Sequence, residues 1–294
     1  MPWQKHCAAA LVTMVLSGFS ASASADTPLA QRLAAIAARS GGTVGIAVIH
    51  VESGERTTLR GDEPLPLYSV FKLPLAVVVL TDIAAGRRRL DEAMRVVPAD
   101  VAPGWSGNTQ RWRKLPLQVT IRRLLELSLV ESDNTASDKL LQLVGGPDAL
   151  TRRLRELGFG AIDVKVSAKE MAALREHPNR ASAVAITNLL AELQRGRLLA
   201  PAQRSVLWDL MGRSRTGTRR LRASLPAGTP VIDKTGSHQD GEATNDVGII
   251  ALPRGRGHLA VSVLIAGSKL AVIRQEQLIA EIGLAAYETY VAKR

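Results

Sequence analysis

Apolar residues form short runs near both ends of the chain and follow a helical period between them. Runs rich in Val, Ile and Ala predict strands at residues 43–51, 231–234, 244–252 and 259–266, and residues 57–60 would complete a hairpin with the first. Spacings of three and four residues predict helices at residues 69–85, 119–130, 134–144, 148–157, 183–195, 201–211 and about 272–291. We therefore expect one sheet assembled from both termini, with a helical insertion.

This order of elements predicts an α/β fold of the α+β type with two lobes. Residues 26–61 plus 213–294 would form an α/β lobe, and residues 62–212 would form an all-helical lobe. The chain has 294 residues, of which 46% are hydrophobic, so it can bury a full core. The helix at 69–85 is apolar on nearly every side, which predicts that it is buried.

The first 25 residues have the features of an export signal. Lys5 and His6 give a basic start, residues 8–19 are apolar, and Ala23-Ser24-Ala25 has the small-x-small form that signal peptidase cleaves. We expect residues 1–25 to be removed and the mature protein to be periplasmic without a stable membrane anchor. An uncleaved anchor is the alternative. The single cysteine lies within this segment, so no disulfide is expected.

Composition argues against several other kinds of partner. The formal net charge is +11, but the basic residues are scattered and aromatic residues make up only 3% of the chain, which leaves little for bases to stack on. We therefore expect no nucleic-acid partner. No His or Cys cluster has the spacing of metal ligands, so neither a metal nor a cofactor is expected. His177 and His238 stand apart on predicted loops and are interpreted as surface residues.

Three polar strings carry the candidate chemistry. They are Ser69-Val70-Phe71-Lys72, Ser132-Asp133-Asn134 and Lys234-Thr235-Gly236. A serine hydroxyl is inert at neutral pH unless a base takes its proton, and Lys72 lies one helical turn beyond Ser69. Burial would lower the pKa of Lys72, whereas a neighbouring carboxylate would raise it. Lys72 would then act either as a neutral base or as a cation that polarises Ser69.

This set of strings resembles the class A serine β-lactamases, relatives of the penicillin-binding proteins. The resemblance implies a five-stranded antiparallel sheet flanked by helices and packed on an all-helical lobe, with the site in the cleft between them. It also implies a periplasmic, monomeric enzyme that hydrolyses an anionic β-lactam through an acyl-enzyme on Ser69. No metal or cofactor would be needed.

The resemblance assigns roles to further residues. Ser132 would deliver a proton to the leaving nitrogen, and Asn134 would bind the side-chain amide of the substrate. Trp105 would line the mouth of the site, although a loop aromatic packed on the surface is an equal alternative. Asp133 would be structural and would hydrogen-bond its own backbone.

Residues of the last string and its surroundings would bind the substrate. Lys234 and Thr235 would form an anion clamp beside Ser132, with Lys234 on the edge strand. Gly236 would let the substrate approach that strand. The backbone N–H groups of Ser237 and Ser69 would form the oxyanion hole. Arg220 would bind a carboxylate, although neighbouring arginines could take that place.

The resemblance is weakest at the residue that should activate water for deacylation. Class A enzymes use a glutamate on an omega-shaped loop, and an ungapped count puts Ala168 at that position. A two-residue shift of the loop would let Glu170 act, and Glu176 is a weaker substitute. Asp138, together with Ala243-Thr244-Asn245-Asp246, resembles a divergent branch that keeps the glutamate.

Two other functions stay open. A penicillin-binding D-Ala-D-Ala peptidase would attack a similar carbonyl next to a carboxylate. A slowly deacylating binder or sensor would trap β-lactams as a stable ester if no carboxylate reaches the water.

Overall fold

The computed structural model describes residues 27–104, 109–174, 177–238 and 240–293. The expected signal at residues 1–25, Trp105 and Glu176 therefore lie outside the described residues. Within the described chain, no helix has the length and apolarity that crossing a bilayer requires.

A five-stranded antiparallel sheet joins the two ends of the chain, as expected. Its order is β2 (Arg56–Leu59), β1 (Thr43–His50), β10 (His258–Ala266), β9 (Ala243–Ala251) and β8 (Val231–Ser237). β8 is an edge strand and continues through Lys234 to Ser237, three residues further than the sequence pattern indicates. The predicted fold class is confirmed.

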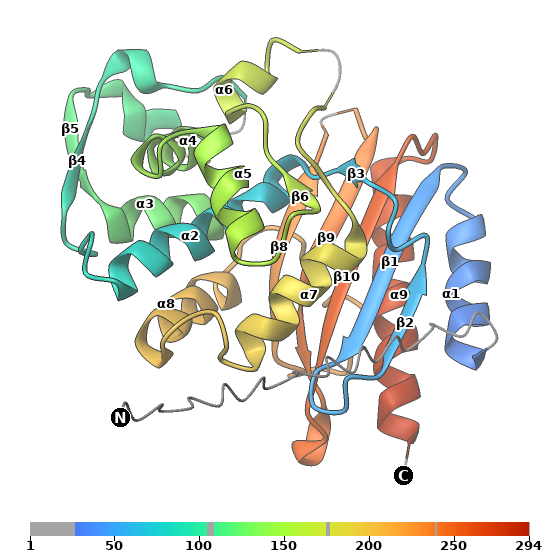
Figure 1. Ribbon diagram of the computed structural model, residues 1–294. Helices are drawn as coiled ribbons and strands as arrows, with labels where there is room; N and C mark the ends of the chain where they lie inside the picture. Colours follow the sequence, from blue (N-terminus) through green and yellow to red (C-terminus); the bar gives the residue numbers. More distant parts are fainter. Residues whose placement is uncertain (1–26, 105–108, 175–176, 239, 294) are drawn as a thin grey trace, which may run out of the picture.

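Both faces of the sheet are covered by helices (Figure 1). In β1, Ile46 and Val48 point to the face packed on α1 (Pro28–Ala38) and α9 (Val272–Ala292), whereas Ala47 and Ile49 point to the opposite face. The opposite face carries α7 (Ala183–Gln194), which packs on β1 and β10. Alternate residues of a strand project to opposite faces, so a sheet covered on both sides is apolar at almost every position.

The helical block surrounds one central helix. α2 (Lys72–Ala84) follows a 3₁₀ turn, η1 (Tyr68–Phe71), and only its last residue is exposed. It packs against α3 (Ile121–Val130), α4 (Asn134–Leu143), α5 (Pro147–Glu156) and α8 (Pro201–Gly212). One apolar core continues from these helices onto the sheet. The lobe boundaries at 61/62 and 212/213 stay a prediction.

Several short elements were not predicted from the sequence. Besides α1, they are β3 (Leu65–Pro66), β4 (Ala93–Val96), η2 (Pro98–Asp100), η3 (Thr109–Arg113), β5 (Leu117–Thr120), β6 (Ile162–Asp163), α6 (Ala168–Met171), β7 (Arg180–Ala181) and η4 (Pro253–Gly255). Most span two to five residues, which is too short for a hydrophobic period to identify. α6 lies in the segment between β6 and β7, next to α4.

Candidate active site

The turn that carries Ser69 is fastened to the sheet by one buried side chain. Asn245 of β9 donates from Nδ2 to the carbonyl oxygens of Pro66 (2.8 Å) and Leu67 (3.2 Å), and its Oδ1 accepts from the N–H of Ile265 (3.1 Å). The N–H of Leu67 donates to the carbonyl oxygen of Asn179 (2.9 Å). These bonds hold the segment before Ser69 in place and leave Ser69 half-buried.

The missing side chain of Gly236 has a structural consequence that the sequence did not indicate. A Cβ on Gly236 would lie 2.4 Å from the carbonyl oxygen of Leu67 and 3.1 Å from the N–H nitrogen of Val70. The missing side chain therefore allows β8 to pack directly against η1, the turn of Ser69. Its nearest neighbour is this turn and not open space for a substrate.

Ser132 joins the two lysines of the site. Its Oγ lies 3.2 Å from Lys72 Nζ and 3.0 Å from Lys234 Nζ, and its carbonyl oxygen lies 2.6 Å from Lys72 Nζ. Both lysines are fully buried. Ser132 has a φ of +57°, in the left-handed region that costs a non-glycine residue about 1–3 kcal/mol. The expected position of Lys234 beside Ser132 is confirmed.

Burial makes it less favourable for either amine to carry a positive charge. It lowers the pKa of Lys72 well below its usual value, and the nearby charge of Lys234 lowers it further. Burial also lowers the pKa of Lys234 to about 7, against the opposing effect of Asp233 and Asp246. Two cations around one hydroxyl would repel each other, and this favours a neutral Lys72 at neutral pH. A neutral amine can accept a proton.

Asp133 and Asn134 begin α4 and have separate roles. Asp133 is the N-cap, accepting from the N–H of Ala136 (2.8 Å), and its other oxygen accepts from Trp112 Nε1 (3.0 Å). The structural role expected for Asp133 is thereby confirmed. Asn134 Oδ1 accepts from Lys72 Nζ (2.8 Å), and its Nδ2 donates to the carbonyl oxygen of Pro103 (3.3 Å).

Two cavities meet at Ser69. The loop cavity, of about 430 Å³, is lined by Tyr68, Ser69, Phe71, Pro103, Gly104, Asn134, Ala168, Met171, Ala172, Leu174, His177, Ser237 and His238. The strand cavity, of about 300 Å³, is lined by Ser69, Ser132, Thr216, Arg220, Thr235, Ser237 and His238. The structure thus brings residues from all three sequence strings to one solvent-accessible place.

Arg220 supplies a positive charge to the strand cavity. Its side chain is buried, with Nη2 donating to Ser237 Oγ (2.7 Å) and Nη1 to the carbonyl oxygens of Asn245 (2.8 Å) and Gly236 (3.2 Å). Its Nε pairs with Glu276 at 3.2 Å. Thr235 Oγ1 donates to Thr216 Oγ1 (2.7 Å) on the cavity wall. A guanidinium fixed in this way suits a carboxylate ligand.

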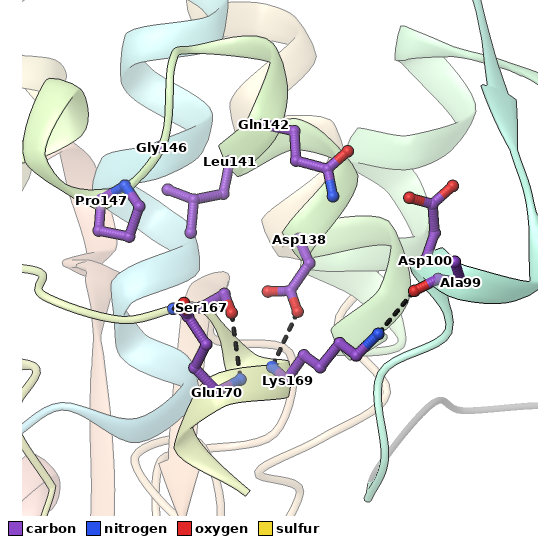
Figure 2. Close-up of a pocket in the computed structure, with 10 residues that line it drawn as sticks. All are labelled: Ala99, Asp100, Asp138, Leu141, Gln142, Gly146, Pro147, Ser167, Lys169 and Glu170. Atoms are coloured by element: carbon purple, nitrogen blue, oxygen red, sulfur yellow. Dashed lines mark hydrogen bonds between the residues drawn. The ribbon is translucent and has the colours of Figure 1, made fainter. Parts of the chain in front are cut away.

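The structure does not bring Glu170 to this site. Ser167 and Glu170 form a capping box: Glu170 Oε2 accepts from the N–H of Ser167 (2.8 Å), and Ser167 Oγ accepts from the N–H of Glu170 (3.1 Å). Figure 2 shows both residues at a third cavity of about 250 Å³, together with Asp138. The two-residue shift that would make Glu170 the base is not observed.

Ala168, and not Glu170, lines the loop cavity. Asp138 of α4 accepts from the N–H groups of Ala168 and Lys169, both at 2.8 Å, and so fixes the start of α6. Figure 2 shows the bond to Lys169. Asn179 closes the segment at its base, accepting from the N–H groups of Lys165 (2.8 Å) and Val166 (3.1 Å). These residues were not recognised as anchors from the sequence, although buried polar side chains in this position usually bind backbone groups.

His177 and His238 do not stand apart from each other, as the sequence suggested. Both rings pack on Tyr68, with ring centroids 3.4 Å and 5.4 Å away, and both line the loop cavity. Burial lowers the pKa of His177 to about 4. Within the described residues, no group of three or more potential ligand side chains is placed to hold a metal ion.

Known proteins resemble this chain along most of its length. The family model described as "Beta-lactamase enzyme family" matches residues 28–290. The extended-spectrum β-lactamase PER-1 of Pseudomonas aeruginosa is 32% identical over 290 residues, which are 96% of this chain and 94% of that protein.

Solved structures agree with this family match. A β-lactamase from Chitinophaga pinensis has a TM-score of 0.85 and 32% identity, covering 90% of this chain and 99% of its own. An ancestral class A β-lactamase has a TM-score of 0.82 and 35% identity, covering 89% and 99%. Together with the two buried lysines around Ser132, these likenesses show that the chain belongs to the class A serine β-lactamases and is a β-lactam hydrolase.

Proposed function

We propose that the protein opens β-lactams by forming an acyl-enzyme on Ser69. The observation that carries this proposal is the position of Ser132 Oγ, which contacts both Lys72 Nζ and Lys234 Nζ next to the cavities that contain Ser69. Neutral Lys72 takes the proton of Ser69 as Oγ attacks the lactam carbonyl carbon. The hydroxyl of Ser132 then passes a proton to the lactam nitrogen as the C–N bond breaks.

The remaining polar residues bind and orient the substrate. Lys234, Thr235 and Arg220 attract its carboxylate in the strand cavity. Asn134, in the loop cavity, binds the side-chain amide. The backbone N–H groups of Ser69 and Ser237 hold the oxyanion, and losing one such donor typically costs about a hundredfold or more in rate.

We further propose that the mature protein acts as a periplasmic monomer, with Trp105 at the mouth of the site. The basic start, the apolar stretch and the Ala23-Ser24-Ala25 sequence support cleavage after residue 25. N-terminal sequencing of the exported protein tests this, and a retained residue 1 would contradict it.

Benzylpenicillin and a chromogenic cephalosporin test the reaction. Mixed with the wild-type protein, each should be ring-opened, and peptide mapping should locate the acyl group on Ser69. Ser69→Ala should neither open the ring nor gain mass. Acylation of the Ser69→Ala protein would refute the assignment. A D-Ala-D-Ala peptide serves as the comparison substrate, and preferential cleavage of it would favour the peptidase alternative.

A further inference from the structure

We propose that hydrolysis of the acyl-enzyme is the slow step of this protein, because α6 presents the methyl group of Ala168, and no carboxylate, to the loop cavity. This inference rests on the proposed acyl-enzyme at Ser69. The carboxylate of the ring-opened substrate would lie in the strand cavity, where Arg220 and Thr235 lie. Residues of α6 line only the loop cavity, so any water that α6 could activate must reach the ester carbon from that side.

The geometry of α6 decides which side chain faces that water. Ala168, Met171 and Ala172 line the loop cavity, and their spacing of three and four residues places them on one helix face. Glu170 is two residues from Ala168, so it projects to a different side, where the capping box with Ser167 holds it (Figure 2). Glu170 cannot turn to the loop cavity without breaking that cap.

The neighbouring carboxylates have other partners. Asp138 uses one oxygen for the N–H of Ala168 and the other for the N–H of Lys169. Asp133 caps α4 with one oxygen and binds Trp112 with the other. Both are bound to N–H groups that they would leave unsatisfied if they moved, which costs about 1–3 kcal/mol for each buried group.

The ionisable groups that line the two cavities among the described residues are poor substitutes. The guanidinium of Arg220 has only donors and no acceptor. Burial raises the pKa of the Tyr68 phenol, which keeps its proton, and the low pKa of His177 makes that imidazole a weak base. His238 Nδ1 accepts from the N–H of Asp240 at 3.3 Å, so in the neutral imidazole the other nitrogen carries the proton and has no free lone pair for water.

Among the described residues, Lys72 is the base that remains, and its position suits the first step better than the second. During acylation the Ser69 O–C bond forms, the lactam C–N bond breaks, and the serine proton reaches the nitrogen through Lys72 and Ser132. During deacylation a water O–C bond forms and the ester C–O bond breaks. One water proton must leave for a base and another proton must return to Ser69. Lys72 Nζ is held by the carbonyl and hydroxyl oxygens of Ser132 and by Asn134 Oδ1, and these contacts place it beside the hydroxyl that protonates the leaving nitrogen.

Intact mass spectrometry of the full mature protein with benzylpenicillin tests the inference. We expect one equivalent to add to most of the chains within seconds and the adduct to persist for minutes. The chromogenic cephalosporin should show a burst of one ring opening per chain, followed by a slow steady rate. Rapid turnover without a burst or adduct would overturn the inference while leaving the hydrolase assignment intact. Neither adduct nor ring opening would instead overturn Ser69 acylation.

Ala168→Glu and its matched control Ala168→Gln identify the cause. The two side chains have nearly the same size, but only the glutamate can take a proton from water. We expect Ala168→Glu to shorten the lifetime of the adduct at least tenfold relative to Ala168→Gln, a threshold set below the about 10²–10⁴-fold that a well-placed general base contributes. Equal lifetimes in two variants that acylate at the wild-type rate would overturn the role assigned to position 168.

Discussion

The contact between Gly236 and the Ser69 turn gives the sharpest mutational prediction. Gly236→Ala places a methyl group 2.4 Å from the carbonyl oxygen of Leu67 and 3.1 Å from the backbone nitrogen and Cγ2 of Val70. Because two of these atoms belong to the backbone, either β8 or η1 must move. Overpacking of this kind costs about 1–3 kcal/mol. We expect the free energy of unfolding to fall by about 2 kcal/mol.

The same movement should slow acylation. A displacement of about 1 Å between a nucleophile and its partners can cost about a hundredfold in rate. Stopped-flow acylation by the chromogenic cephalosporin, together with urea unfolding, measures both effects. Gly212→Ala is the matched control, because its Cβ would lie 3.5 Å from Ile232 Cγ2, at ordinary contact distance. An acylation rate in Gly236→Ala equal to that of the Gly212→Ala control would refute the reasoning.

Three further predictions follow from the site. The pKa of Lys234 near 7 means that its charge is lost as pH rises through neutrality, so KM for an anionic β-lactam should rise there, and Lys234→Arg should flatten the KM–pH profile. Glu170→Gln should leave both hydrolysis and adduct lifetime unchanged, and a large effect in either assay would restore Glu170 as the base. Asn245→Ala should lower the free energy of unfolding, measured by urea denaturation, by about 3 kcal/mol. The carbonyl oxygen of Pro66 and the N–H of Ile265 would each lose a hydrogen bond. Thr244→Val should be neutral or stabilising by contrast, since Thr244 Oγ1 has no partner among the described residues, and equal losses in the two variants would contradict this.

Lys234 also affects stability. Its pKa in the folded protein lies near 7, below its ordinary value of 10.5, so between these pH values the unfolded chain binds more protons than the folded one. Its contribution to stability should therefore increase as pH rises across this window.

The sequence predicts the framework of the site well because the signals there are strong. The long helices and the central strands end within a few residues of their expected positions, since their hydrophobic periods are long. The three strings predict which chemical groups Ser69, Ser132 and Lys234 bring to the site. Their mutual distances depend on tertiary packing, which the strings do not contain.

Other features depend on partners far away in the chain. Asn245 looks like an unfavourable residue in an apolar strand until its partners at Pro66 and Leu67 are known. The tilted packing of the His177 and His238 rings on Tyr68 has no local signal in the sequence. The position of Glu170 could have been inferred, because a serine followed three residues later by a glutamate is the signature of a capping box.

The central claim is that buried Lys72 is a neutral base for Ser69, and the pH dependence of acylation tests it most directly. The single-turnover acylation rate should be measured from acid to alkaline pH in Lys234→Arg, so that the titration of Lys234 does not interfere. We predict that the rate rises along one ionisation well below 10.5, the ordinary lysine pKa, and becomes level before that pH is approached. A rate that keeps rising until the pH approaches 10.5 would contradict this account of the site.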